Sequence, residues 1–316
     1  MDLNRFFAAL NAIKTNSINF TKYPKLASEL HHHVLSYCYK STLLNYSMCS
    51  KSCDLEVQRF NTEPPYCLVI TQNRESVNVE MFYTPIFGIV EKDFKFSDSE
   101  VMMEEMKKCF MKCYKYVGER NTTSTLSIDV RQWPTEVMSI RHVKNIEDMG
   151  VTIYKSMSED FMDYFQNSDH HITGLTLSEC NEVSDRATIG SDFFKTEVFR
   201  RLETAEIYVK CEIESSDFIN LEKKRVHLKS SISFDDIRTK MRLWNSTTHE
   251  KNWRFTIELP EDDDRQLNIH DIFPSNRFHV IPMVDIGVEE YQVGNVVVTI
   301  EQEDSEKIMD FRFETN

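Results

Sequence analysis

Short β-type runs that recur through the second half of the chain constrain its fold more than any other feature. They follow one another at intervals of roughly twenty to thirty residues, and they are 126–130, 151–154, 172–177, 205–209, 225–228 and 254–259. Helical stretches lie between them, at 159–166, 192–202, 217–221 and 234–244. Consecutive parallel strands need a crossover that returns the chain to the same end of the sheet. Strand and helix units in this order therefore predict a parallel sheet.

The spacing of these units leaves more than one kind of parallel sheet open. Units of this period favour a sheet that curves like an irregular leucine-rich solenoid, in which each unit contacts its neighbours. The intervals are uneven and the leucine and asparagine positions vary, so the sequence defines no consensus repeat. An open twisted α/β sheet is the alternative.

Further β-type runs flank the alternating region on both sides. Residues 67–71 and 77–83 have the pattern of strands joined by a polar turn, and they predict a hairpin. The runs 278–281, 294–300 and 308–313 are expected to add antiparallel strands that cover an edge of the sheet. The predicted fold class is α+β: a small N-terminal helical module, then an α/β body of alternating short strands and helices, irregular and leucine-rich-repeat-like, closed by C-terminal antiparallel strands.

Capping patterns mark the ends of some of the predicted helices. Ser97 and Glu100 form a capping-box pattern, the apolar residues that follow recur at helical spacing, and Gly118 ends the helix. Ser233 with Asp236 three residues later is a further N-terminal cap signal. That later helix presents an apolar side formed by Ile237, Met241 and Trp244.

Charge and composition exclude several classes of protein. The formal net charge of −14, from 51 acidic and 37 basic residues, repels phosphate groups at long range. Neither nucleic acid nor an anionic membrane is expected as a partner, and the basic cluster 223–225 is expected to be a solvated face. No apolar run reaches the roughly eighteen residues of a membrane-spanning helix, and the N-terminus lacks a signal-peptide pattern. We expect a soluble intracellular protein, cytoplasmic or nuclear.

Few residues in the chain point to catalysis. With seven glycines, the sequence has no glycine-rich nucleotide-binding loop and no nucleophile elbow. His31 to His33 cannot converge on one metal ion, because consecutive helical residues point about 100° apart. The pair 170–171 is histidine and lies near Asp163 and Asp169, but no nucleophile or oxyanion donor can be assigned beside it. We expect no enzymatic activity, no cofactor and no metal ion.

The cysteines are interpreted as buried and reduced side chains. Eight are scattered along the chain without the density of a secreted disulfide scaffold. Cys49 and Cys53, and likewise Cys109 and Cys113, are four residues apart, so each pair could share a metal ion from one helix face. Core packing is the preferred interpretation, because a metal site would need further ligands from elsewhere. The acidic run 261–264 lacks the spacing of a calcium loop and is predicted to be an exposed turn.

The N-terminal region predicts two short amphipathic helices. Apolar residues recur at helical spacing from Leu26 to Cys38, a break follows at 40–42, and a second apolar set begins at Leu43. A span of about forty residues buries too little apolar surface to be stable alone. The pair must therefore complete its core on the rest of the chain or on a partner.

The order of residues in this region resembles an F-box, the helical module that docks on a Skp-family adaptor of cullin-based ubiquitin ligases. The resemblance covers about residues 22–60 and includes the stretch 47–50, and it departs from the family pattern at Ala27, where the family usually has proline. It implies an adaptor-binding set that consists of Leu26, Glu29, Leu30, Val34, Leu35, Leu43, Leu44 and Met48. Apolar periodicity alone also fits a pair of helices that belong to an ordinary core.

A further segment resembles the F-box-associated domain of the large nematode F-box families. Residues 218–244 and 253–259 give a strand, a serine-containing turn, an acidic helix that ends in tryptophan, and another strand, in the order found there. The match covers about forty residues. The two resemblances occur in the expected order along the chain and support each other.

Length and the two resemblances together define the expected organisation. A chain of 316 residues exceeds the usual size of one compact core. We expect an adaptor-binding module at 20–62, a connecting hairpin and helix at 63–118, and an F-box-associated or leucine-rich-repeat-like recognition domain at 119–316. The resemblances imply a substrate-recognition subunit of an SCF-type E3 ubiquitin ligase, which holds an unknown protein target without catalysis of its own. A ligase-independent solenoid scaffold is the alternative, and a hydrolase or transferase that uses His170 and His171 is a third hypothesis.

Overall fold

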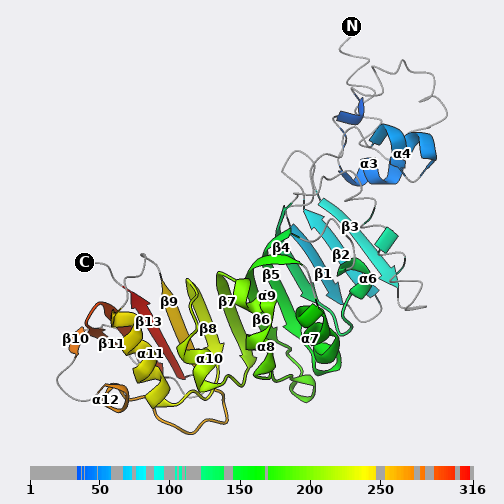
Figure 1. Cartoon of the computed structure of the whole chain (residues 1–316). Helices are drawn as coiled ribbons and strands as arrows, with labels where there is room; N and C mark the ends of the chain where they lie inside the picture. The colour runs from blue at the N-terminus through cyan, green and yellow to red at the C-terminus, as the bar shows by residue number, and fades with distance from the viewer. Residues whose placement is uncertain are drawn as a thin grey trace.

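The computed structural model describes the chain from residue 34 onward with gaps (Figure 1). The described residues are 34–36, 38, 40–47, 49–57, 67–72, 76–82, 89–95, 104, 107–108, 111, 122–138, 145–167, 170–246, 253–273, 278–281, 288–302 and 307–313. Within them the protein is a mixed α/β structure built on one sheet of 13 strands. None of the helices in these ranges has the length and apolar character needed to cross a membrane.

The strands of the sheet extend from β1 near residue 67 to β13 near residue 313. Their bounds are β1 (Cys67–Gln72), β2 (Ser76–Phe82), β3 (Ile89–Lys95), β4 (Thr122–Asp129), β5 (Asn145–Ile153), β6 (His171–Glu179), β7 (Thr204–Lys210), β8 (Arg225–Lys229), β9 (Arg254–Glu258), β10 (His279–Ile281), β11 (Val288–Val293), β12 (Val296–Gln302) and β13 (Lys307–Phe313). The sheet order is β10-β11-β12-β13-β9-β8-β7-β6-β5-β4-β1-β2-β3. From β5 to β9, therefore, every strand lies beside the strand that precedes it in the sequence.

Helices occupy the connections between these strands. Their bounds are α3 (Lys40–Ser47), α4 (Lys51–Val57), α6 (Thr135–Met138), α7 (Ser158–Asn167), α8 (Asp192–Lys195), α9 (Glu197–Arg201), α10 (Ser215–Ile219), α11 (Phe234–Ser246) and α12 (Ile269–Ile272), with single 3-10 turns η3 (Lys155–Met157) and η4 (Val183–Asp185). In Figure 1 the helices α7 to α11 lie on the same side of the sheet.

The predicted parallel sheet is confirmed. Strands β1 and β4 to β9 are parallel to one another, because each helix carries the chain back to the end of the sheet at which the previous strand began. The predicted antiparallel strands at the C-terminal end are also confirmed: β13 pairs with β9, and β12, β11 and β10 continue outward from it. The predicted hairpin is β1 and β2, which pair from Cys67↔Phe82 to Gln72↔Val77.

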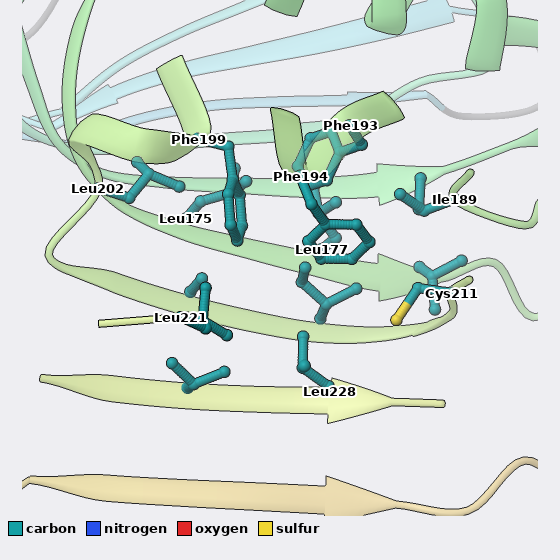
Figure 2. Close-up of a cluster of buried hydrophobic side chains, with 14 of the residues drawn as sticks. Leu175, Leu177, Ile189, Phe193, Phe194, Phe199, Leu202, Cys211, Leu221 and Leu228 are labelled. Atoms are coloured by element: carbon teal, nitrogen blue, oxygen red, sulfur yellow. The ribbon is translucent and has the colours of Figure 1, made fainter. Parts of the chain in front are cut away.

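Alternation along the strands places an apolar face under the helices. In β7, Ala205, Ile207 and Val209 are buried, and in β8 the buried pair is Val226 and Leu228. Figure 2 shows how side chains from β6 to β8 meet those of α8 and α9 in one cluster. Since successive side chains of a strand point to opposite faces, the residues between these apolar positions face away from the helices.

A row of aromatic rings runs through this core beneath α7, α8 and α9. Consecutive ring centroids lie 4.8 to 5.5 Å apart along the row, which consists of Trp133, Phe161, Phe165, Phe193, Phe194 and Phe199. Edge-on and tilted arrangements predominate, as the quadrupoles of the rings prefer. Through this row, the helices of neighbouring strand–helix units pack against each other and against the sheet.

The predicted cap of α11 is confirmed. Asp236 donates its backbone N–H to Ser233 Oγ at 3.1 Å, and Ser233 donates its hydroxyl to Asp236 Oδ2 at 2.7 Å. This satisfies one of the N–H groups that the start of a helix leaves without a partner. The apolar side of the helix is buried as expected, through Ile237, Met241 and Trp244.

Some predicted boundaries are wrong. The single helix expected over 192–202 is broken into α8 and α9, because Thr196 leaves the helical conformation and its hydroxyl accepts a hydrogen bond from Phe199 N at 3.2 Å. The break expected at 40–42 is part of α3, which begins at Lys40. Strands β3 and β11 were not predicted. Of the helix expected over 101–118, the structure describes residues 104, 107–108 and 111 as helical, and the rest lies outside the described residues.

The expectation of a solvated basic face at 223–225 is wrong for Lys223. This side chain is buried, and its ammonium donates to Phe199 O and Leu202 O, each at 2.7 Å. These carbonyls belong to the end of α9, where the last turn lacks intrahelical donors. Burial lowers the pKa of Lys223 to about 8. Lys240 is buried in the same way, donating to Ile219 O at the end of α10.

Candidate protein-binding face

The face of the sheet opposite the helices is the candidate functional site. Its side chains come from the alternate positions of the strands, and they are mostly polar or charged, in contrast to the apolar helix-bearing face. On the central strands they are Ser127, Asp148, Thr176, Glu206, Tyr208, Arg225, His227, Lys229, Arg254, Thr256, Glu258, Asp310 and Arg312. We call this surface the open face.

Three arginines lie side by side on the open face. Arg225 of β8 pairs in register with Arg254 of β9, and Arg254 pairs with Arg312 of β13. Neighbouring strands are about 4.8 Å apart, so these residues form a row across the sheet, which we call the arginine row. Like charges directly opposite each other on neighbouring strands are unfavourable. The arrangement therefore needs compensation from nearby carboxylates.

Carboxylates on the same face supply that compensation. Arg254 Nε donates to Asp310 Oδ1 at 2.7 Å, and Thr256 Oγ1 donates to the same oxygen at 2.8 Å. The hydrogen bond to Asp310 raises the pKa of Arg254 above its ordinary value. The other pairs of the row are Arg225 Nη1 with Glu206 at 3.4 Å, Arg312 Nη2 with Glu290 at 3.1 Å, and Arg312 Nε with Asp310 at 3.6 Å.

An exposed tyrosine stands next to the arginine row. Tyr208 is 38% exposed, and its ring lies against that of His227 with 4.3 Å between the centroids. Its hydroxyl donates to Glu206 Oε2 at 3.2 Å. The pairing of β7 with β8 shifts register between Ile207 and Lys210, so Tyr208 lies at an irregularity of the strand. Such bulges re-aim side chains and often occur near functional sites.

A network of ion pairs borders Tyr208 on the side of the carboxyl ends of the strands. Glu258 accepts from His227 Nε2 and from Lys229 Nζ, each at 3.0 Å. Burial opposes ionisation of Glu258, but these hydrogen bonds outweigh it, so the pKa of Glu258 is lowered. Lys229 also lies 3.8 Å from Glu179. The network holds its charges in fixed positions and leaves the exposed Tyr208 ring at its border.

The adaptor-binding residues predicted from the F-box resemblance are only partly within the described residues. Leu26, Glu29, Leu30 and Met48 lie outside them, and Leu44 lies on α3 without a described side chain. The structure buries Leu35 and Leu43 in a small cluster that consists of Leu35 and Cys38 before α3, Leu43 and Tyr46 of α3, and Val57 of α4; Val34 packs against it. Leu35 and Leu43 therefore support this helical pair from within instead of forming its surface. Leu55 on α4 is 60% exposed.

The histidine pair 170–171 does not converge on one point. His170 is buried, with its ring 5.2 Å from that of Tyr164, whereas His171 is exposed at the start of β6. Asp163 accepts a hydrogen bond from Asn167 at 2.9 Å, and Asp169 lies outside the described residues.

The structure describes some of the cysteines that were predicted to pack in the core or to bind a metal ion. Cys38, Cys180 and Cys211 are buried as expected, but Cys49 is exposed, because it lies in the turn before α4. Cys109 and Cys113 lie outside the described residues. Across the described ranges, no group of three or more His, Cys, Asp or Glu residues is arranged to hold a metal ion.

The acidic run 261–264 is a turn, closed by a hydrogen bond from Asp263 N to Pro260 O at 2.9 Å. Glu261 and Asp262 are exposed as predicted, but the side chain of Asp263 is buried. It accepts from Arg265 Nε at 2.9 Å, and hydrogen bonding to Arg265 holds the pKa of Asp263 well below its usual range.

Sequence reasoning did not single out the arginine row as a site. A signal was present, because Arg225 and Arg254 are each the first residue of a predicted β run, directly before an apolar position. In comparisons with known proteins, no family model matches the chain, and no curated protein or solved structure is significantly similar to it.

Proposed function

We propose that this chain is a recognition subunit that binds a protein target on its open face. The observation that carries the proposal is the contrast between the two faces of one sheet. One face is apolar and covered by α7 to α11 (Figure 1). The other face presents arginines, a tyrosine and fixed ion pairs. Tyrosine and arginine are enriched among the residues that contribute most to protein interfaces.

We further propose that the N-terminal helices connect this recognition surface to a ubiquitin ligase. The F-box resemblance supports this step, with Leu26, Glu29, Leu30, Leu44 and Met48 as the residues that contact a Skp-family adaptor and through it a cullin. In this arrangement Leu35 and Leu43 stabilise the helical module, since both are buried in one cluster with Val57 of α4. The chain then acts by proximity: it raises the effective concentration of a bound target near a ubiquitin-charged enzyme.

The adaptor step is tested by titrating the purified full-length chain with a purified Skp-family adaptor. We expect saturable binding that Leu30→Asp weakens by at least about tenfold, which corresponds to about 1.4 kcal/mol. Leu55→Asp is the matched control, because Leu55 is exposed on α4 and lies outside the implied adaptor-binding set. If the wild-type chain does not bind the adaptor, or if both variants bind as well as it does, the ligase assignment is refuted.

A ligase-independent interaction scaffold is the second candidate function. The burial of Leu35 and Leu43 within the chain's own helical cluster favours it, because part of the implied docking set is already covered. A scaffold would bind its target on the open face and show no adaptor affinity. The same titration therefore separates the two candidates, while Tyr208→Ala is expected to weaken target binding under both.

A further inference from the structure

In the arginine row, the positively charged side chains are more exposed to solvent than the carboxylates that pair with them. The side chains of Arg225, Arg254 and Arg312 are 59%, 52% and 47% exposed. The carboxylates that pair with them are more buried, at 27% for Glu206, 8% for Asp310 and 16% for Glu290. A partner that approaches the open face therefore meets guanidinium groups first. The carboxylates beneath hold these groups in place and offset their mutual repulsion.

The guanidinium groups have hydrogen-bonding capacity beyond these pairs. Each guanidinium carries five N–H donors in a planar fork. Within the described part of the chain, Arg254 donates through Nε and Arg225 through Nη1. The remaining donors of these side chains lie on exposed groups. Arginine uses such donors to bind carboxylates in a bidentate manner, which favours it where a carboxylate is recognised.

Tyr208 adds an apolar contact beside the row. Its ring is held by His227 on one side and by the hydrogen bond to Glu206, so little rotamer freedom is left to lose on binding. Arg225 pairs with the same Glu206. The tyrosine ring and the first arginine of the row are therefore positioned by a shared carboxylate and present a combined polar and apolar surface.

We infer that the open face binds an acidic, extended segment of a protein, with its carboxylates on the arginine row and an apolar side chain on Tyr208. The inference rests on the proposed function and specifies the chemistry of its target. Charge complementarity selects this occupant. The carboxylates that pair with the row offset its charge at long range, so this complementarity acts at contact, where the guanidinium groups project beyond their partners.

A peptide titration tests the inference directly. The probe is a fluorescein-labelled peptide of about ten residues, alternating glutamate and serine with one central leucine; fully extended it spans about 33 Å, enough to cross from β7 to β13. Two matched peptides carry glutamine or lysine in place of glutamate. Binding to the full-length chain is followed by fluorescence anisotropy. We expect the glutamate peptide to bind at least about tenfold more tightly than either control, and raised salt to weaken it because it screens the charges.

Variants assign the binding to the arginine row. Arg225→Gln and Arg312→Gln should each weaken the glutamate peptide by about tenfold, as expected for a charge pair within an interface. Arg201→Gln is the matched control, since Arg201 pairs with Glu197 on α9, on the helix-bearing side. Tyr208→Ala should weaken binding and Tyr208→Phe should retain it, because the ring and not the hydroxyl makes the contact. Thermal unfolding of each variant shows whether it is folded.

The outcomes separate this inference from the proposed function. Equal affinity for the glutamate and glutamine peptides, or an Arg225→Gln variant that binds as the wild type does, overturns the acidic-segment inference. Preferential binding of the lysine peptide also overturns it. In each of these cases the adaptor titration still decides the ligase assignment, because Leu30 lies outside the arginine row. Loss of adaptor binding with retained arginine-dependent peptide binding would instead refute the ligase assignment alone.

Discussion

Replacing Phe193 with alanine should destabilise the middle of the sheet without unfolding its C-terminal end. Phe193 is fully buried, and its ring centroid lies 5.1 Å from that of Phe165, 5.2 Å from Phe199 and 5.5 Å from Phe194. Removing a buried phenylalanine ring typically costs about 3–5 kcal/mol, more where the surroundings cannot collapse. Because the ring joins α7 to α8 and α9, we expect a value near the upper end, about 4–5 kcal/mol.

The location of the effect follows from the sheet order. From β5 to β8 each strand is hydrogen-bonded to both of its neighbours in sequence, so the loss is transmitted through adjacent units. Hydrogen exchange followed by mass spectrometry should show reduced protection of β6, β7 and the helices above them, while β12 and β13 change little. Urea unfolding gives the overall loss in the free energy of unfolding.

The matched control for Phe193→Ala is Val183→Ala. Val183→Ala removes an apolar side chain that is 73% exposed, and it should change the free energy of unfolding by less than about 0.5 kcal/mol. A loss below about 2 kcal/mol for Phe193→Ala, or an equal loss of protection in every strand, would refute the reasoning from neighbouring units.

Further predictions concern a buried charge, a cap and a glycine. Lys223 has a folded pKa of about 8 against an ordinary value of 10.5. Between these values the unfolded chain binds more protons, so wild type should gain stability relative to Lys223→Met as pH rises from about 8 to 10.5. Urea unfolding of both proteins at several pH values checks this. A difference in the free energy of unfolding that stays constant or falls with pH contradicts it. Ser233→Ala removes the cap of α11 and should cost about 1 kcal/mol by urea unfolding, whereas Ser233→Thr, which keeps the hydroxyl, should retain most of that stability. Gly150→Ala has room for its methyl group, with Ser127 Oγ the nearest atom at 3.9 Å, and should stabilise the strand by roughly 0.5 kcal/mol; a drop in the urea midpoint would contradict this.

The positions of the central strands could be predicted because their signals are local. Runs such as 205–209 and 225–228 alternate apolar and polar residues, and the helical stretches between them leave a crossover as the connection. Strand β3 could not be found in this way, since its sequence Ile-Val-Glu-Lys-Asp-Phe-Lys has no clear apolar alternation. The break at Thr196 also escaped prediction, because the hydrogen bond that favours it forms only once the local turn exists.

The arginine row depends on strand pairings that the sequence alone does not give. Arg312 joins the arginine row only because β13 returns antiparallel to β9 with Arg312 opposite Arg254. The antiparallel direction of β13 was predicted, but its partner strand and its register cannot be read from the residues themselves. The burial of Lys223 has a similar origin, since its acceptors belong to residues more than twenty positions earlier in the chain. Contacts of this kind require the three-dimensional structure.

The order of strands β4 to β9 also bears on how such a protein could change during evolution. Since each strand from β5 to β9 lies beside its predecessor, the duplication or deletion of one whole strand and helix would preserve every other pairing in the series. The surface opposite the helices would then become wider or narrower by one row of side chains. Gene rearrangement could thereby alter the length of ligand that is accommodated, while the remaining units keep their architecture.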